Sequence, residues 1–263
     1  MHTAAHGRTR QRAVARLALL FALVSGTLTA ETSVPERIAS AKASVVGVGT
    51  LLPTRRPPAA VYGTGFAVGD GRHVITNFHV IPDVLASERH ETLVVFVGHG
   101  ENAQPRTAKV IKTDPEHDLA LLRLDGPPLP PLPVDAATPV REGEDLLFTG
   151  YPIGHILGLY PTSTKAMVSN IAPVAIPAST AAQLNAKTIK RLRDPYPIYQ
   201  LDAVSFPGNS GSPLYRISDG AVVGVLNSVL IKESKEAALS NPTSITYAIP
   251  ASHVLPLLEA IAP

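Results

Sequence analysis

A serine between two glycines is the residue of this chain best suited to act as a nucleophile. It is Ser210, in the stretch Pro207–Pro213, which reads Pro-Gly-Asn-Ser-Gly-Ser-Pro. The glycines and prolines predict a tight turn that presents the hydroxyl together with backbone N–H groups. Because a serine hydroxyl is a poor nucleophile unless a base takes its proton, the turn indicates acyl-transfer chemistry only if a histidine and a carboxylate accompany it.

A histidine and an aspartate in suitable positions occur upstream of Ser210. His79 follows a predicted hairpin over residues 63–77, and Asp118 directly precedes the apolar strand Leu119–Leu124. The chain order His, Asp, Ser is that of chymotrypsin-like proteases, whereas α/β-hydrolases with a similar glycine–serine pattern have the order Ser, Asp, His. The order therefore favours a protease-like triad.

Other residues compete for two of these positions. Asp114 is the alternative carboxylate, but Asp118 is favoured because it opens the apolar strand. Ser205 and Ser212 are the alternative nucleophiles, but neither has a glycine on both sides at the spacing seen around Ser210.

The elements that must position these side chains are predicted to be strands. Short apolar and β-branched runs separated by turn signals recur along the chain, a pattern typical of a β-barrel or sandwich. The predicted strands are Val45–Leu52, Tyr62–Val68, Val74–Thr76, Leu93–Val97, Ala108–Lys112, Leu119–Leu124, Leu146–Gly150, Thr164–Ile171, Ile198–Ala203, Pro213–Ile217, Ala221–Asn227 and Ser244–Ile249.

Helices are predicted at both ends of this strand-rich region. Ser33 and Glu36 can form a capping box for a helix that is expected to run to about Ala43. A C-terminal helix is expected over Pro250–Ile261. The segment Ala178–Arg193 has helical propensity and is interpreted as a surface insertion with one helix.

The stretches that bear the motifs resemble the trypsin-like serine peptidases of bacteria, most of all those of the HtrA (Deg) type. They are Gly63–Ile81, Asp114–Leu124 and Pro207–Leu230, and the resemblance extends over roughly Ser44–Leu258. It implies an all-β, chymotrypsin-like fold of two six-stranded β-barrels with short N- and C-terminal helices. A proline-rich crossover near residues 125–140 would join the two barrels.

The resemblance also implies a role for each motif residue. Ser210 would attack a peptide carbonyl, His79 would take its proton, and Asp118 would orient the imidazole. The N–H groups of Gly208 and Ser210 would form the oxyanion hole. Trypsins have an aspartate where this chain has Asn209. Because Asn209 cannot form an ion pair with a new N-terminus, activation by N-terminal insertion is not expected.

The substrate pocket is predicted from the same resemblance. Val204 would form its base, and Asn227, Ser228 and Val229 would form the opposite wall. Because this set holds no charged side chain, the pocket would favour a small or medium aliphatic residue before the scissile bond. The serine turn is also similar to that of glutamyl endopeptidases, but Val225–Asn227 stands where their pocket histidine would be.

The first thirty residues have the composition of an export signal. Four arginines precede the apolar run Leu17–Val24, and small or polar residues lead to a predicted cleavage after Ala30. This divides the chain into a signal peptide, residues 1–30, and a protease domain, residues 31–263, of a periplasmic or secreted protein. About fifty residues follow Ser210, so the PDZ domain that HtrA relatives carry there is not expected.

Composition narrows the classes of function. The net charge of +2 rests on 23 basic and 21 acidic residues, and the leader contributes four of the basic ones. The rest of the chain is slightly acidic, so its charge does not indicate nucleic-acid binding. Cysteine is absent and the histidines lack metal-ligand spacing, so no disulfide, metal or cofactor is expected.

The leading hypothesis is an exported serine endopeptidase that acts on proteins or peptides. It would meet the membrane only through its export signal, and an oligomer is compatible with the sequence. A non-catalytic, chaperone-like or binding protein on the same fold is one alternative. An esterase that uses the same three residues is another.

Overall fold

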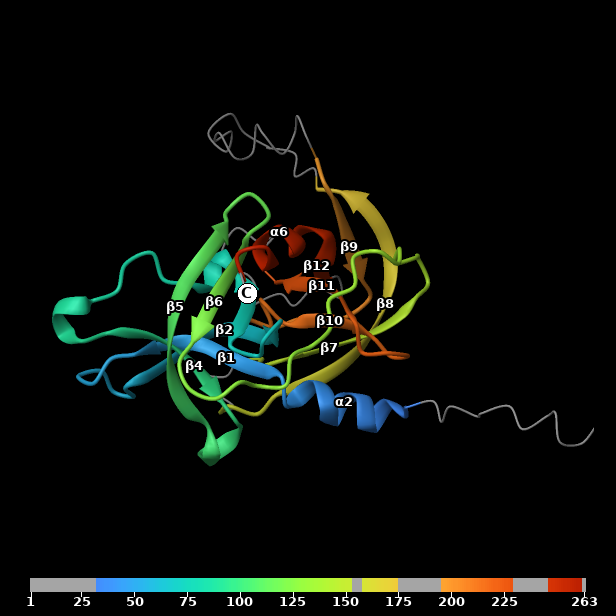
Figure 1. Cartoon of the computed structure of the whole chain (residues 1–263). Coiled ribbons are helices and arrows are strands. Elements are labelled where there is room, and N and C mark those ends of the chain that lie inside the picture. Colours follow the sequence, from blue (N-terminus) through green and yellow to red (C-terminus); the bar gives the residue numbers. More distant parts are fainter. Residues whose placement is uncertain (1–31, 153–157, 175–194, 229–245, 262–263) are drawn as a thin grey trace, which may run out of the picture. The chain divides into compact units, whose positions relative to one another are not determined.

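The computed structural model describes residues 32–152, 158–174, 195–228 and 246–261, and in these ranges its strands close into two antiparallel barrels (Figure 1). The expected pair of six-stranded barrels is confirmed, and each predicted strand overlaps one observed strand. The first barrel consists of β1 (Val45–Leu51), β2 (Ala59–Val68), β3 (His73–Asn77), β4 (Thr92–Val97), β5 (Gln104–Asp114) and β6 (Leu119–Leu124). The second consists of β7 (Asp145–Gly150), β8 (Thr162–Pro173), β9 (Pro197–Leu201), β10 (Pro213–Arg216), β11 (Val222–Asn227) and β12 (Thr246–Pro250).

Strand order brings distant parts of the sequence to the same end of each barrel. The first barrel has the order β1-β2-β3-β6-β5-β4, so β3 and β6 are neighbours and Asn77 pairs with Leu119. Residues that follow β3 therefore meet residues that precede β6. The second barrel has the order β10-β11-β12-β9-β8-β7, in which Pro213 pairs with Val225. The serine turn before β10 therefore lies near the end of β11.

Apolar side chains fill each barrel and also the space between them. Valines and leucines dominate both barrel interiors, as small barrels require. A third cluster combines buried residues of both barrels, among them Phe66 and Ile75 of the first and Tyr151 and Tyr215 of the second. This shared cluster holds the two barrels together beside the segments that carry the motifs.

The connection between the barrels, residues 125–144, hydrogen-bonds to both of them. Its first half lies against the first barrel, where the Leu132 N–H donates to the Ala67 carbonyl at 2.9 Å. Its second half lies against the second barrel, where the Asp135 N–H donates to the Val222 carbonyl at 2.9 Å.

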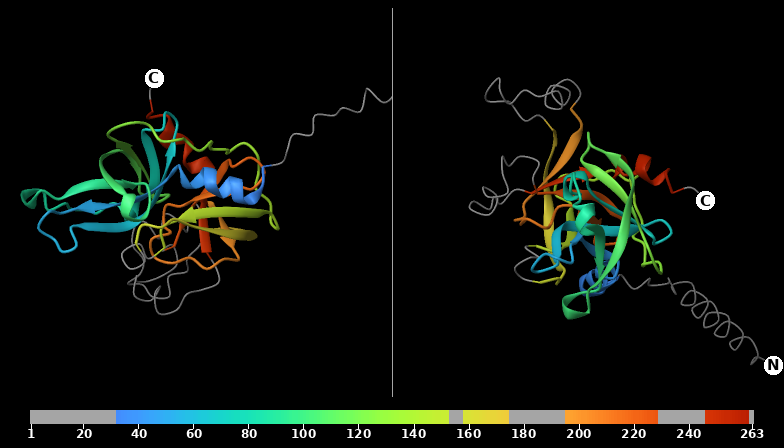
Figure 2. Two further views of the ribbon diagram at one scale, coloured as in Figure 1. Left: turned by 90° about the horizontal axis from the view of Figure 1, so that it is seen from below. Right: turned by 90° about the vertical axis from the view of Figure 1, so that its left-hand side faces the viewer.

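The N-terminal helix forms as its capping residues predict. Helix α2 spans Val34–Lys42, and the Ser33 N–H donates to a carboxylate oxygen of Glu36 at 3.0 Å. The helix lies against the second barrel, because Arg37 donates to the carbonyl oxygen of Ile217 at 3.1 Å (Figure 2).

The C-terminal helix is shorter than expected. The sequence predicted one helix over Pro250–Ile261, whereas the structure has a 3-10 turn, η5 (Ala251–His253), followed by the single-turn helix α6 (Leu255–Leu258). Pro256 is the physical reason, because it has no N–H for the helical bond to the residue four positions earlier and its ring crowds that carbonyl. Within the described ranges, the other short helices are η1 (Phe78–Val80), η2 (Ser87–Arg89) and η3 (Gly100–Asn102).

Two of the segments predicted from the sequence lie outside the described residues. The predicted insertion helix, residues 178–193, lies outside the described residues, as does the leader. Among the described helices, none has both the length and the apolar character needed to cross a membrane.

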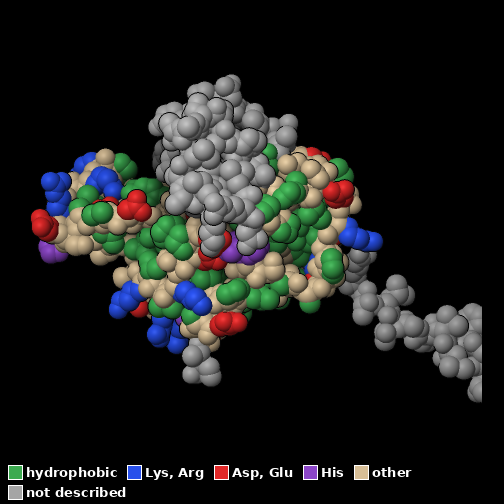
Figure 3. Space-filling view, turned by 90° about the horizontal axis from the view of Figure 1, so that it is seen from above, with side chains coloured by type: hydrophobic (Ala, Val, Ile, Leu, Met, Phe, Trp, Pro, Cys, Tyr) green, Lys and Arg blue, Asp and Glu red, His purple; other side chains and the backbone are tan. Residues whose placement is uncertain are grey.

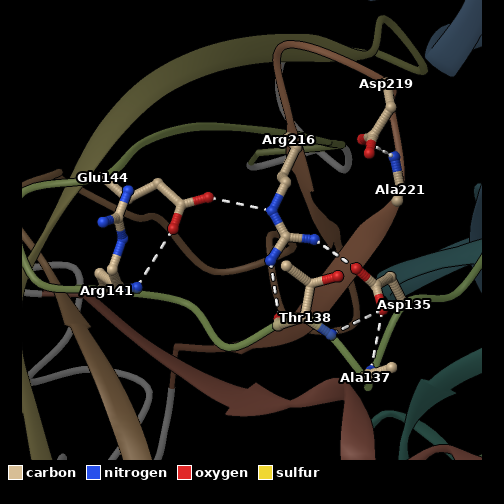
Figure 4. A network of polar contacts seen from close by, with 8 residues as sticks. All are labelled: Asp135, Ala137, Thr138, Arg141, Glu144, Arg216, Asp219 and Ala221. Carbon is tan, nitrogen blue, oxygen red and sulfur yellow. Dashed lines mark hydrogen bonds and ion pairs between the residues drawn. The ribbon is translucent and has the colours of Figure 1, made fainter.

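A buried arginine ties the inter-barrel connection to the second barrel (Figure 4). Arg216, at the end of β10, is 8% exposed. Its guanidinium lies 2.6 Å from Asp135 and 3.0 Å from Glu144, and it also donates to the Thr138 carbonyl at 2.8 Å. Hydrogen bonds from Thr138, Ala137 and Arg216 lower the pKa of Asp135 to about 2.

Replacing Arg216 with methionine should lower the melting temperature by roughly 5–10 °C, because two acidic groups lose their shared partner. Lys165→Met is the matched control, since the Lys165–Asp145 pair is exposed and such pairs contribute little. Because the Asp135 pKa is depressed in the folded state, its contribution is present above about pH 4 and is lost as the pH falls toward 2. Thermal unfolding of both variants at pH 7 and pH 3 tests this. Equal melting temperatures for the two variants would contradict it.

Candidate active site

His79 and Asp118 form the central contact of the site. His79 lies in η1 directly after β3, and Asp118 directly precedes β6. The His79 Nδ1 atom lies 2.6 Å from Oδ2 of Asp118, and the His79 backbone N–H donates to Oδ1 at 2.9 Å. The carboxylate thus binds both the ring and the backbone of one histidine. This fixes the orientation of the imidazole and leaves its Nε2 atom for proton transfer.

The backbone of Asp118 adopts an uncommon conformation to make this contact. Its φ of +56° is in the left-handed region, which costs a residue other than glycine roughly 1–2 kcal/mol. Two hydrogen bonds to its carbonyl oxygen hold it there, one from the Asn77 side chain at 3.0 Å and one from the Phe78 N–H at 3.0 Å. The local fold therefore stabilises the position of the carboxylate.

The Asp118 carboxylate also accepts a hydrogen bond from the second barrel. The Asn227 side-chain amide, at the end of β11, donates to Oδ2 at 2.7 Å. Asp118 is 7% exposed, and burial alone would raise its pKa. Hydrogen bonds from His79 and Asn227, together with the nearby imidazole, outweigh that effect and lower the pKa below its usual value.

Asp114, the other carboxylate considered from the sequence, faces a different histidine. Its Oδ2 atom lies 2.6 Å from Nδ1 of His117. In the structure, Asp118 and not Asp114 is bonded to His79.

The residues before Ser210 form the tight turn that the sequence predicts. The Asn209 N–H donates to the Phe206 carbonyl at 3.0 Å, and Gly208 has a φ of +101°. A proline at the second position and a glycine with positive φ at the third are the signature of a type II turn.

The hydroxyl and two amide groups of this turn remain available. Ser210 is 3% exposed, and its Oγ accepts a hydrogen bond from the Ser228 N–H at 3.3 Å. Among the residues that the structure describes, the N–H groups of Gly208 and Ser210 donate to no acceptor in the chain. Two unpaired N–H groups beside a serine hydroxyl could bind a developing oxyanion.

Asn227 and Ser228 connect the carboxylate to the hydroxyl. These consecutive residues contact Asp118 and Ser210 respectively. The Asp118 carboxylate of the first barrel and the Ser210 hydroxyl of the second barrel are therefore bonded to neighbouring residues at the end of β11. A histidine bonded to a carboxylate, with a serine hydroxyl one segment away, is suited to nucleophilic acyl transfer.

Comparison with known proteins identifies the family. The chain matches the trypsin-like peptidase domain over residues 63–225. It belongs to that family.

Curated relatives of this trypsin-like domain are bacterial endoproteases. A probable periplasmic serine endoprotease, DegP-like, from Pseudomonas putida (strain W619) is 30% identical over 202 residues, covering 76% of this chain and 36% of that protein. A protein of the same description from Chlamydia muridarum is 34% identical over 171 residues, covering 65% of this chain and 29% of that protein. The chain thus spans about a third of the length of these relatives. The resemblance to HtrA (Deg) peptidases is confirmed.

Solved structures share the fold of this trypsin-like domain. The Rv3671c protease from M. tuberculosis in its active form has a TM-score of 0.62 at 26% identity, covering 86% of this chain and 84% of that chain. The HtrA-type protease AlgW with a tripeptide has a TM-score of 0.61 at 22% identity, covering 87% of this chain and 63% of that chain. The latter likeness shows the fold alone, and the expected chymotrypsin-like architecture is confirmed.

The four residues predicted to line the substrate pocket have different surroundings in this trypsin-like domain. Val204 follows β9 and is 40% exposed. Asn227 is buried and directs its amide to Asp118. Ser228 contributes its backbone N–H to Ser210, and Val229 lies outside the described residues.

Two buried polar residues of the site were missed by sequence reasoning. Asn77 holds the Asp118 carbonyl, and Thr64 hydrogen-bonds to the Gly208 carbonyl at 2.7 Å. Both are fully buried in strands of the first barrel. A polar side chain at an interior strand position is the signal that could have revealed them, because a buried polar group requires a partner.

No metal centre accompanies the site in the described ranges, where no three histidine or acidic side chains are placed to hold an ion.

A stack of histidines lies beside the first residues of β6. The rings of His117 and His253 are 3.9 Å apart and nearly parallel, and Tyr196 packs edge-on against both. Figure 3 shows a face on which histidine and acidic side chains lie together near the centre. Burial, and then the neighbouring His117, lower the pKa of His253 to about 4, while Asp114 and Glu116 act in the opposite direction.

We expect His253 to make the fold sensitive to mild acid. Its folded-state pKa lies below the ordinary value, so the unfolded chain binds the extra proton between about pH 6.5 and pH 4, and stability decreases as the pH falls through that range. His253→Phe keeps a ring against His117 without titrating. Between pH 7.5 and pH 5, the free energy of unfolding measured in urea should fall less for this variant than for the wild type. His99→Gln, at an exposed position, should behave as wild type. An unchanged acid sensitivity in His253→Phe would refute the expectation.

Proposed function

We propose that this trypsin-like domain is a serine endopeptidase whose catalytic triad is Ser210, His79 and Asp118. The observation that carries the proposal is the double hydrogen bond between His79 and the Asp118 carboxylate, at 2.6 and 2.9 Å. Asn227 and Ser228 link that carboxylate to the Ser210 hydroxyl. The shared family and the names of the curated relatives support the same reaction.

In the proposed reaction Ser210 Oγ attacks the carbonyl carbon of a peptide bond while His79 Nε2 takes its proton. The developing oxyanion is bound by the N–H groups of Gly208 and Ser210, which are free in the described part of the chain. His79 then delivers the proton to the leaving amine, and water hydrolyses the acyl-enzyme in a second cycle of the same steps. Asp118 holds the imidazole and stabilises its charged form.

We propose that substrates are cleaved after small or medium aliphatic residues. The support is the partly exposed, apolar side chain of Val204, which the resemblance places at the base of the pocket. An aliphatic pocket discriminates only modestly, by about 1–3 kcal/mol per methylene. We therefore expect a preference rather than strict specificity.

We also propose that the protein is exported through a signal peptide over residues 1–30 and acts on proteins or peptides outside the cytoplasm. The curated relatives are named as periplasmic, which supports this proposal. Sequencing the N-terminus of protein from the periplasmic fraction tests it, with a new terminus near Glu31 expected. Recovery of the uncleaved chain from the cytoplasm would refute it.

A fluorophosphonate probe tests the proposed function directly. Labelling of the purified protein is expected at Ser210 and should be absent in Ser210→Ala. Mass spectrometry of a peptide library then reports which bonds are cleaved. Cleavage mainly after arginine or glutamate would overturn the pocket proposal. No labelling and no cleavage would favour a binding protein, and turnover of small esters without casein cleavage would favour an esterase.

A further inference from the structure

Thr64 is the residue through which the first barrel contacts the serine turn. It lies in β2 and is fully buried. Its backbone N–H donates to the Ser210 carbonyl at 2.8 Å. Its hydroxyl donates to the Gly208 carbonyl at 2.7 Å and accepts a hydrogen bond from the Tyr151 N–H at 3.0 Å. One side chain therefore joins β2, the serine turn and the segment that follows β7.

The hydroxyl of Thr64 is held in one direction. The Thr64 carbonyl accepts a hydrogen bond from the Thr76 hydroxyl of β3 at 2.7 Å, which fixes the strand at this residue. The branched Cβ of threonine also restricts its χ1 rotamer. The hydroxyl has both a donor and an acceptor partner, so it costs little to bury.

The hydroxyl of Thr64 fixes the peptide group that follows Gly208. The Gly208 carbonyl is bonded to Thr64, and the next N–H, that of Asn209, is bonded to the Phe206 carbonyl. This carbonyl and this N–H belong to one peptide group, which is thus held at both its oxygen and its nitrogen, and Gly208 has a φ of +101°. In this arrangement, the Gly208 N–H is left without an acceptor among the described residues.

The space around this contact leaves little room for an alternative. A Cβ on Gly150 would lie 2.0 Å from the Ser212 hydroxyl and 2.9 Å from the Thr64 hydroxyl. The serine turn is therefore packed closely against β2 and the end of β7. If the Thr64 hydroxyl were removed, no neighbouring backbone group could move into its place unless the surrounding residues also shifted.

We propose that Thr64 is a positioning residue for the oxyanion hole, holding the Gly208 carbonyl so that the Gly208 N–H stays directed to the substrate alongside that of Ser210. The proposal rests on the proposed peptidase function. It makes catalysis depend on a residue outside the triad. That residue comes from the first barrel, whereas the serine turn belongs to the second, and its hydroxyl touches no reacting atom.

The test compares Thr64→Val with Thr64→Ser in the full chain. The valine variant keeps the shape of the side chain and loses the hydrogen bond, whereas the serine variant keeps the hydroxyl. We expect Thr64→Val to lower kcat for a peptide substrate by roughly 10- to 100-fold with KM changed less than about threefold. Thr64→Ser should retain kcat within about threefold of wild type.

A second readout reports on the oxyanion hole itself. A peptide boronate forms a tetrahedral adduct with the serine, and one of its oxygens occupies the hole. Its inhibition constant should increase in Thr64→Val by about the factor by which kcat falls. Titration of the active site with the fluorophosphonate measures the concentration of active enzyme. Dividing the rate by that concentration keeps unfolded protein from lowering the apparent kcat.

Thr50→Val is the matched control. Thr50 is also a fully buried threonine of the first barrel whose hydroxyl is hydrogen-bonded, in this case to Glu91 and Tyr62. It should lower the melting temperature without lowering kcat. Thr64→Ala serves as a second variant if the valine variant does not fold.

The outcomes separate this inference from the proposed function. If the wild type shows no labelling at Ser210, the proposed function fails, and the inference fails with it. If the wild type is active but Thr64→Val retains kcat and boronate affinity, only the inference is overturned. It is also overturned if Thr64→Ser loses as much activity as Thr64→Val, or if neither the valine nor the alanine variant folds, because Thr64 would then be a structural residue.

Discussion

Replacing Ser210 with alanine is expected to lower kcat for peptide hydrolysis by a factor of ~10⁴ to 10⁶, because the variant has no atom that can attack the carbonyl. The remaining rate would come from substrate binding and the N–H groups of the turn. Binding of a peptide substrate should change little, since the hydroxyl is removed without disturbing the backbone. The measurement is kcat and KM on a chromogenic peptide, with the melting temperature recorded for each variant.

Ser205→Ala is the matched control for this prediction. Ser205 is also buried and was an alternative nucleophile in the sequence. It should keep kcat within a few-fold of wild type. If Ser205→Ala lost activity while Ser210→Ala retained it, Ser205 would be the nucleophile. That result would contradict the proposed triad.

Asp118→Asn extends the same test to the carboxylate. An asparagine retains the size of the side chain. In the wild type, His79 and Asn227 both donate to Oδ2 of Asp118, and the asparagine would place an N–H donor at that position instead of an acceptor. The histidine would then hold its proton on the wrong nitrogen, which lowers kcat by about 10⁴ in triads of this kind. Asp114→Asn should have a much smaller effect, because Asp114 contacts His117 instead.

Gly211→Ala is expected to be a strongly damaging single-methyl change. A Cβ at Gly211 would lie 2.0 Å from the Thr64 carbonyl oxygen, and the residue has a φ of +87°. Both the overlap and the left-handed backbone oppose alanine. We expect the free energy of unfolding to fall by roughly 2–5 kcal/mol and kcat to fall at least about 100-fold, because the serine turn must move away from β2.

Gly143→Ala separates the two causes of that effect. Gly143 has a similar φ of +84°, but nothing lies within 4 Å of its added Cβ. It should cost about 1 kcal/mol of stability, from the backbone conformation alone, and leave kcat unchanged. Chemical unfolding and peptide kinetics on the two variants give the comparison. If Gly211→Ala were as mild as Gly143→Ala, close contact between the turn and β2 would be disproved.

The strands were predictable because their information is local. Short apolar runs bounded by glycine, proline and asparagine indicate strands and turns without reference to the rest of the chain, and each predicted strand overlaps an observed one. The helix start at Ser33 was predictable for the same reason. The C-terminal helix was overpredicted because its apolar pattern continues across Pro256, whose missing N–H breaks the helix.

Residues that act through distant partners could not be assigned in the same way. Asn227 was predicted as part of a pocket wall, and the fold places its amide on Asp118. Thr64 and Asn77 carry no motif, and their contacts with the Gly208 and Asp118 carbonyls follow from how the barrels close. The partner of a buried polar side chain depends on strand register and barrel packing, which no local pattern contains.

The sequence by itself determined the candidate nucleophile and its tight turn, because both depend on residue types within a few positions. It also determined the order of histidine, aspartate and serine, because that order is a property of the chain and not of its folding. Only the tertiary structure decided which carboxylate faces His79. Asp114 and Asp118 are four residues apart, and the pairing of β3 with β6 places Asp118 beside η1. Only the tertiary structure also brought Thr64 of one barrel to the serine turn of the other, because that contact depends on the packing of two closed barrels.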